Sequence, residues 1–217
     1  MSDIFREVDE ELKRDKALLL LRQYGKYAIA FAVAAVVMTA ALVGWQNYRE
    51  SQRESDGRSF ATAMHHVAAK DTPAATAAFG KLAQSGGGYH VLALLQQAAL
   101  KTKAGDVSGA AAIYDQLAGD SNVDRPFRDL ATILSALVTF DKADPAILDK
   151  KLAPMSAEGA AFRPSALELR GLLAVKRGDF KTGRQYFQQL ADDITAPGGL
   201  RQRATQILAW LGERGGV

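Results

Sequence analysis

The sequence contains no cysteine. Thiolate metal ligands and cysteine nucleophiles are therefore excluded. A chain without thiols suits an oxidising compartment, although many cytosolic proteins also lack cysteine.

Charged residues are missing from a window of 22 residues, 27–48, whose core runs from Ala28 to Trp45. At a rise of about 1.5 Å per residue, this core forms a helix about 27 Å long, close to the roughly 30 Å hydrocarbon thickness of a bilayer. Only Thr39 interrupts the apolar surface, whereas a buried core helix usually keeps a polar edge. The window predicts one transmembrane helix over residues 27–48.

A cleavable signal peptide is the main alternative, and its apolar region typically spans about 7 to 15 residues behind a short basic start. Here 26 residues precede the window, and six of them are acidic. Aromatic rings flank both ends, where they favour the headgroup zone of a bilayer. We therefore expect a retained anchor; the flanking aromatic residues are Tyr24, Tyr27, Trp45 and Tyr48.

Basic residues near the window predict its orientation, because Lys and Arg resist translocation. Five precede it and three follow it: Lys13, Arg14, Lys16, Arg22 and Lys26, then Arg49, Arg53 and Arg58. This bias predicts a cytoplasmic tail over residues 1–26 and an exported domain over residues 49–217. In a bacterium the anchor would lie in the inner membrane and the domain in the periplasm.

A concentrated positive charge is also missing. The net charge is +3, and 21 basic and 18 acidic residues follow the tail. Nucleic-acid binding would need Lys and Arg gathered on one face, so we expect no nucleic-acid partner. The exported segment is long enough for one domain with a real core.

The tail itself has a helical pattern. Apolar residues recur at Ile4, Phe5, Val8 and Leu12, and Ser2 or Asp3 can cap the start of a helix. The pattern predicts either an amphipathic helix that docks on a cytoplasmic partner or the inner membrane surface, or a helix that continues into the span.

A repeat organises the exported domain. Asp71, Asp106, Asp144 and Asp179 are separated by 35, 38 and 35 residues, and each follows an apolar helical stretch. Similar residues recur at four fixed distances from each Asp. They are Ala63, Ala98, Ala136 and Gly171 eight residues before; Ala75, Ala110, Leu148 and Gly183 four after; Phe79, Tyr114, Leu152 and Phe187 eight after; and Leu82, Leu117, Met155 and Leu190 eleven after.

This spacing has a physical meaning. A small side chain lets two helices cross closely, an aromatic side chain further along fills the angle between them, and Asp caps the second helix. One pair cannot bury its apolar face alone, and no strand pattern is apparent. We predict an all-α, right-handed solenoid of about four helix pairs.

A capping helix is expected at residues 200–214. It should place Ile207, Leu208, Trp210 and Leu211 toward the stack and Arg201, Arg203, Glu213 and Arg214 outward.

The pattern resembles the tetratricopeptide repeat. The match is clearest between Pro164 and Pro197, the second repeat keeps part of the pattern, and the first and third are degenerate. The matching residues are Gly171, Gly178, Asp179, Phe180, Gly183, Phe187 and Pro197, with Ala98, Gly105, Ala110, Tyr114 and Leu117 in the second repeat.

The whole layout, with a short tail, one span and exported helical repeats, resembles the ancillary subunit family of the SecYEG translocon. The opening SDIFREVDEEL and the segment KYAIAFAVAAVVMTAALVGWQNY are similar to alphaproteobacterial members. The resemblance implies a role beside the translocon, with Sec subunits, periplasmic chaperones and emerging polypeptides as partners. It brings no catalytic residues.

Residues that could support chemistry are few. His65 and His66 point about 100° apart on a helix, and His90 has no second ligand at helical spacing, so we expect no metal. Gly86, Gly87 and Gly88 lack the Gly-Lys-Ser/Thr sequence of a phosphate loop and are interpreted as a connection between repeats. We expect no cofactor and no enzymatic activity.

A binding surface is the remaining prediction, because stacked pairs form a concave face lined by the first helix of each pair. An apolar groove would suit a segment of a non-native chain. Several of its residues could instead belong to the core between helices. By the pattern of the tetratricopeptide repeat, the groove residues are Phe60, Met64, Leu95, Ala99, Ile133, Leu137, Glu168 and Leu172.

The competing hypothesis is an envelope scaffold that organises a cell division or cell-wall complex without chaperone activity. A chaperone binds many unfolded chains weakly, whereas a scaffold binds one folded partner. The sequence leaves both open, together with homo-oligomerisation.

Overall fold

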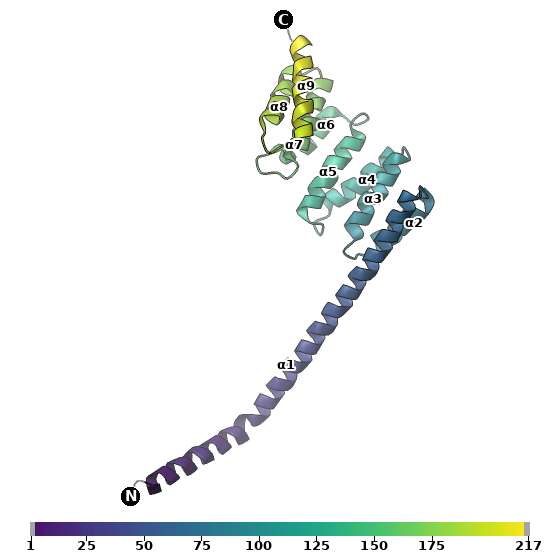
Figure 1. The fold of residues 1–217 in the computed structure, drawn as a ribbon. Coiled ribbons are helices and arrows are strands. Elements are labelled where there is room, and N and C mark those ends of the chain that lie inside the picture. Colours follow the sequence, from purple (N-terminus) through teal and green to yellow (C-terminus); the bar gives the residue numbers. More distant parts are fainter. Residues whose placement is uncertain (1–2, 215–217) are drawn as a thin grey trace. The chain divides into compact units, whose positions relative to one another are not determined.

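All regular elements in the described part of the chain are helices, which confirms the all-α prediction (Figure 1). The structure is a computed structural model that describes residues 3–214, with side-chain surroundings described for residues 23–212 except 25 and 28. The helices are α1 Asp3–Ala68, α2 Thr72–Gln84, α3 His90–Lys103, α4 Val107–Gly119, α5 Arg125–Thr139, α6 Pro145–Leu152, the 3-10 helix η1 Ala153–Ser156, α7 Arg163–Lys176, α8 Phe180–Asp192 and α9 Gly198–Arg214.

The chain divides into two units, Met1–Ser55 and Asp56–Val217, and α1 contributes to both. Since α1 is continuous from Asp3, the tail helix runs on into the apolar segment, as one of the two alternatives predicted. The tail side chains of that prediction lie outside the described residues; they are Ser2, Asp3, Ile4, Phe5, Val8 and Leu12.

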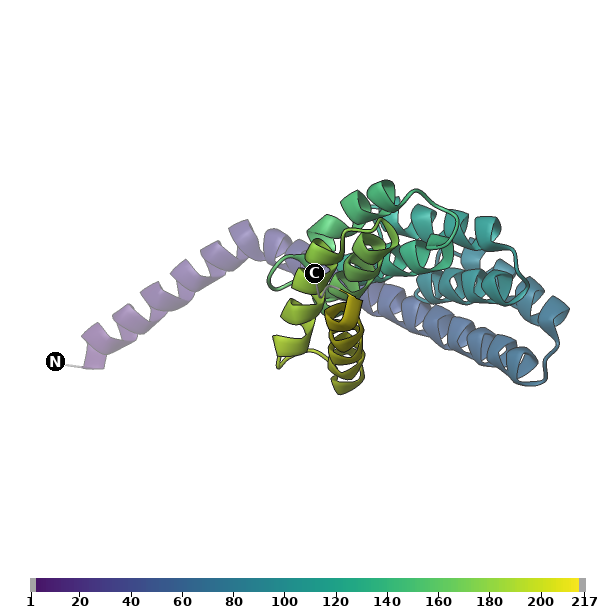
Figure 2. The ribbon, with the colours of Figure 1, turned by 90° about the horizontal axis from the view of Figure 1, so that it is seen from above.

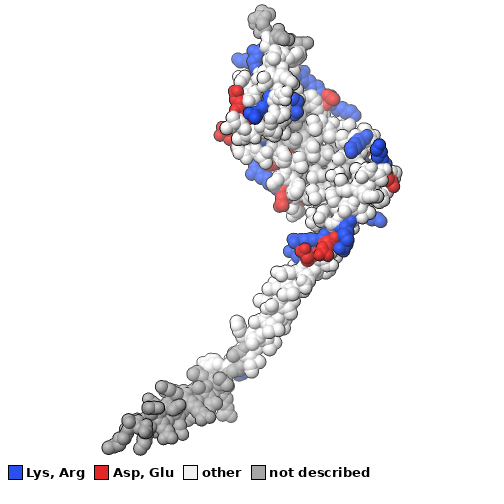
Figure 3. Space-filling view, viewed as in Figure 1, with Lys and Arg blue, Asp and Glu red and all other residues white. Residues whose placement is uncertain are grey.

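The first unit exposes its apolar side chains. Phe31 is 76% exposed, and every described residue from 29 to 48 is exposed in the same way. Figure 3 shows this stretch as a surface without charge, followed by charged side chains. By length and composition it is apolar enough to cross a membrane, and a signal sequence would meet the same criteria.

The second unit is a stack of helix pairs, seen from a second direction in Figure 2. The four aspartates of the repeat all cap the second helix of a pair, as predicted. Hydrogen bonds lower the pKa of Asp106, chiefly from Lys101, and that of Asp179, chiefly from Thr182. The carboxylates accept from the backbone N–H groups of Ala74 at 3.1 Å, Gly109 at 2.9 Å, Ala146 at 2.7 Å and Thr182 at 3.0 Å.

Three of the four turns between paired helices share one backbone motif. A residue with positive φ precedes the capping Asp: Lys70 at 59°, Gly105 at 81° and Gly178 at 78°. The Asp N–H then donates to the carbonyl five residues earlier, as Asp71 does to His66 at 2.9 Å. The third turn, between α5 and α6, has no residue with positive φ.

The residues of the repeat register form the core. Apart from the capping aspartates, every one of them is buried except Met155, which is half-buried because α6 ends at Leu152 and η1 follows. Four apolar clusters succeed one another along the stack. They are centred on Ala63, Phe79 and Leu82; on Ala98, Tyr114 and Leu117; on Ala136, Leu148 and Leu152; and on Phe187, Leu190 and Leu211.

The last cluster is completed by α9, the predicted capping helix. Leu211 is buried, and Ile207 and Leu208 pack partly against the stack, as expected. Two other side chains were placed wrongly: Trp210 is 39% exposed and Arg201 is half-buried. The buried face follows residues 200, 204, 207, 208 and 211, so the missed Ala204 is buried in it and Trp210 falls outside. Glu213 and Arg214 have no described side chain.

Candidate protein-binding surface

One predicted groove residue in each pair directly follows the small residue at the helix crossing. These residues lie on the first helices α1, α3, α5 and α7 and are Met64, Ala99, Leu137 and Leu172. Leu137 is 55% exposed and Met64 is 38% exposed, whereas Ala99 and Leu172 are half-buried. Equivalent residues of stacked repeats share a face, so the four form a row along one side of the stack. We refer to them as the exposed row.

The other four predicted residues lie one helical turn earlier. Ile133 is only 7% exposed and belongs to the core of the third pair, as the alternative interpretation held. The ring of Phe60 packs against Phe79 and Tyr89, with centroids 5.5 and 5.3 Å apart. Leu95 packs partly against the core of the second pair. Apart from Glu168, these four residues therefore pack against the core beneath the exposed row.

Glu168 is held by an arginine that the sequence did not place near the groove. Arg203 of α9 donates through Nε at 2.8 Å and through Nη2 at 3.2 Å to the two carboxylate oxygens. Hydrogen bonding to Glu168 raises the pKa of Arg203. Arg203 stands 35 residues after Glu168, so the repeat spacing itself was a signal for this contact. The pair links α7 to α9.

A second link lies beside the exposed row. Lys176 Nζ donates to the carbonyl oxygens of Phe140 at 2.8 Å and Asp141 at 3.2 Å, and it lies 5.1 Å from the centroid of the Phe140 ring. Phe140 follows Leu137 by three residues and Lys176 follows Leu172 by four, which are neighbouring positions on a helix surface. The middle of the row therefore combines apolar side chains with one cation. Neither Phe140 nor Lys176 was predicted from the sequence.

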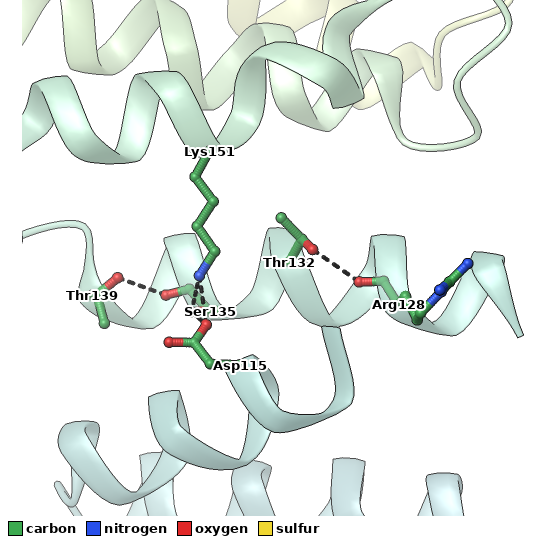
Figure 4. Close-up of polar contacts among 6 residues, drawn as sticks. All are labelled: Asp115, Arg128, Thr132, Ser135, Thr139 and Lys151. Carbon is green, nitrogen blue, oxygen red and sulfur yellow. Dashed lines mark hydrogen bonds and ion pairs between the residues drawn. The ribbon is translucent and has the colours of Figure 1, made fainter. Parts of the chain in front are cut away.

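Figure 4 shows the most organised polar cluster, which joins α4, α5 and α6. Ser135 Oγ donates to Asp115 Oδ1 at 2.6 Å, and Lys151 Nζ donates to the same oxygen at 2.5 Å and to Ser135 Oγ at 2.9 Å. Burial raises the pKa of Asp115, but the hydrogen bonds from Lys151 and Ser135 outweigh it and leave this pKa below its ordinary value.

This cluster has the residue types and the contact distance of a Ser–Lys nucleophile, but its lysine is in an ion pair and its serine is buried. A lysine that activates serine has to be neutral, whereas Lys151 is paired with a carboxylate. Ser135 is 1% exposed, so a substrate does not reach its hydroxyl. The three side chains act as a polar link between the second and third pairs.

The histidines and glycines lie apart from this cluster. His66 Nδ1 lies 3.9 Å from Asp71 Oδ2, and His90 Nδ1 contacts the carbonyl of Ala83. Within the described residues no three potential ligands among His, Asp and Glu gather around a metal position. Gly86 has a φ of 65° in the loop that connects α2 to α3, where a connection between repeats was expected.

Comparison with known proteins gives one result for the whole arrangement. Neither curated proteins nor solved structures provide a match. The family model described as a tetratricopeptide repeat-like domain matches residues 20–208, from before the apolar segment to within α9. Domains of this kind generally mediate protein–protein interactions. The chain thus belongs to the tetratricopeptide repeat-like domain family.

Proposed function

We propose that the chain is a membrane-tethered protein-binding module that assists the Sec translocon. The observation that carries the tether is the continuous exposure of an uncharged helical stretch, residues 29–48, in a chain whose other unit has an apolar core. Exposed apolar surface of this extent needs a partner, and a bilayer matches its length. The family match includes this stretch as well as the repeats.

The basic residues beside the apolar stretch indicate how the chain is oriented across the membrane. Five basic residues close before the stretch and three close after it favour a tail in the cytoplasm and a repeat unit across the inner membrane, in the periplasm. The similarity of the tail and span to the ancillary subunits of the translocon supports the same arrangement. A repeat unit held there meets polypeptides as they emerge.

The exposed row supplies the binding surface of this proposal. Leu137 and Met64 present apolar area, and Phe140 and Lys176 add a ring and a cation beside Leu137. Such a surface favours side-chain contacts with extended or helical segments of many sequences, and therefore weak binding. Tethering raises the local concentration near the membrane exit, so that weak capture is effective.

A pair of matched substitutions tests the surface. Leu137 and Ile147 are both exposed aliphatic residues of the third pair, on its first and second helix respectively. Leu137→Glu should weaken capture of an unfolded model polypeptide by the full chain in nanodiscs, and Ile147→Glu should leave it unchanged. Equal effects of the two substitutions would remove the exposed row from the proposal.

Purification from gently solubilised membranes tests the partner, with the tail intact or deleted. Recovery of Sec subunits supports the translocon role. Recovery of division or cell-wall proteins alone, together with failure to suppress aggregation of an unfolded protein, would favour the scaffold instead.

A further inference from the structure

A groove of about 550 Å³ runs between α1 and α2 within the second unit. It lies on the first helix pair, which no other pair precedes among the described residues. Its lining comes from the part of α1 beyond residue 55, from α2, and from Ser85 after α2. The lining residues are Asp56, Ser59, Thr62, His66, Ala74, Ala77, Ala78, Lys81, Leu82 and Ser85.

The later pairs show what occupies the corresponding place. In the second and third pairs, the residue nine before the capping Asp meets the residue nine after the previous capping Asp, on the preceding second helix. Ser135 of α5 donates to Asp115 of α4 at 2.6 Å. A Cβ added to Gly80 of α2 would lie 3.3 Å from Gln97 Nε2 of α3. The residue in this position of the first pair is Thr62, in the groove.

The first helices of the first and third pairs also match in composition here. The residues 15, 12, 9 and 5 before the capping Asp are Asp56, Ser59, Thr62 and His66 in the first pair and Asp129, Thr132, Ser135 and Thr139 in the third. The second pair has Val91 and Leu94 at the first two positions. In the third pair, Ser135 of this set contacts α4 and donates to the carboxylate of Asp115.

The groove also offers a cation. Lys81 is exposed at its edge, and within the described part of the chain it makes no ion pair or hydrogen bond. Thr62 Oγ1 donates to the Arg58 carbonyl at 3.0 Å, and within the described part of the chain no hydrogen bond from another helix reaches it. Alanines at 74, 77 and 78 leave room for a helix to approach closely.

We propose that the groove between α1 and α2 binds an amphipathic α-helix of a partner protein, seated as α4 is seated on α5 and carrying a carboxylate toward Thr62 and Lys81. The alanines contact the small apolar face of this helix. The site is distinct from the exposed row and does not depend on its function.

The probe is a stapled helical peptide with the sequence of α4, Val107–Gly119, in its native form and with Asp115→Asn or Asp115→Lys. Its binding to the full chain in nanodiscs is followed by fluorescence anisotropy. The native peptide should bind, and the Asn and Lys peptides should bind about fivefold more weakly, the size expected for one partly exposed ion pair. Lys81→Glu in the chain should reverse the order of the Asp and Lys peptides.

Two more variants locate the bound peptide. Ala77→Trp fills the groove and should abolish binding, whereas Lys181→Glu on the exposed face of α8 should leave it unchanged. Circular dichroism verifies that each variant keeps its helices. The proposal is overturned by absence of binding at millimolar peptide, by equal binding of the three peptides, or by binding that survives Ala77→Trp and disappears in Leu137→Glu.

Discussion

A Cβ on Gly171 would lie 2.8 Å from the Cζ atom of Phe187. Gly171 lies on α7 at the crossing with α8, and both residues are buried. The other pairs have Ala63, Ala98 and Ala136 at this position, so they leave room for a methyl group. The crossing of α7 and α8 in the fourth pair is therefore too close for a side chain larger than that of glycine at position 171.

Gly171→Ala should destabilise the second unit by about 1–3 kcal/mol, because overpacking a buried contact forces side chains or backbone to shift. Phe187→Leu in the same chain should recover part of this loss, since it removes the atom that the new methyl group meets. Urea unfolding followed by circular dichroism measures both. Gly212→Ala is the control: nothing lies within 4 Å of its added Cβ, and it should be neutral or slightly stabilising. Equal losses for the two Gly→Ala variants would contradict the close crossing.

Lys70 is the one non-glycine residue with a positive φ in the described chain, at 59°. Lys70→Gly should raise the free energy of unfolding by about 0.5–1 kcal/mol, because the left-handed conformation costs a residue with a Cβ about 1–2 kcal/mol and glycine returns part of that in backbone entropy. Gly178→Ala, at the equivalent position with a φ of 78°, should lower it. Thermal unfolding should show a higher melting temperature for Lys70→Gly and a lower one for Gly178→Ala. Shifts of the melting temperature in the same direction would be incompatible with a shared turn conformation.

The link between Asp115 and Lys151 predicts a dependence on pH. The pKa of Asp115 is lowered in the folded chain, so its contribution is present above its unfolded pKa of about 3.9 and is lost as the pH falls through the folded value. Asp115→Asn should therefore reduce the free energy of unfolding at pH 7, and its difference from the natural chain should shrink below pH 4. Lys151→Met should show the same trend. Differences that stay constant from pH 7 to pH 3 would mean that the ion pair does not act on stability.

The repeat could be predicted because every turn between paired helices needs a cap and every crossing needs a small side chain. Asp71 and Ala63 thus predicted the first pair even though it matches the tetratricopeptide repeat pattern poorly. Contacts between successive helix pairs were harder to predict from the sequence. Ser135 looked like an ordinary helix residue, and only the folded chain brings it against Asp115 twenty positions earlier.

The residues of the predicted binding groove were harder to identify, because the exposure of a side chain depends on the rotation of its helix within the stack. One turn separates Ile133 from Leu137, yet the first is in the core and the second is exposed. The same limit applies to Trp210, one position from the buried Leu211. Apolar character alone does not distinguish a core position from a binding position when both lie on the same helix.

The exposed apolar stretch of α1 gives a direct test of the tether. Val36 lies in its middle, and Val36→Arg should cost about 2.5–3.5 kcal/mol of insertion free energy, since a charge at the centre of a span is opposed by the hydrocarbon. More of the chain should then be released from membranes by alkaline carbonate. Gln52→Arg, beyond the stretch but on the same helix, adds the same charge and should release none. Release by both substitutions, or by neither, would indicate that residues 27–48 do not hold the chain in the bilayer.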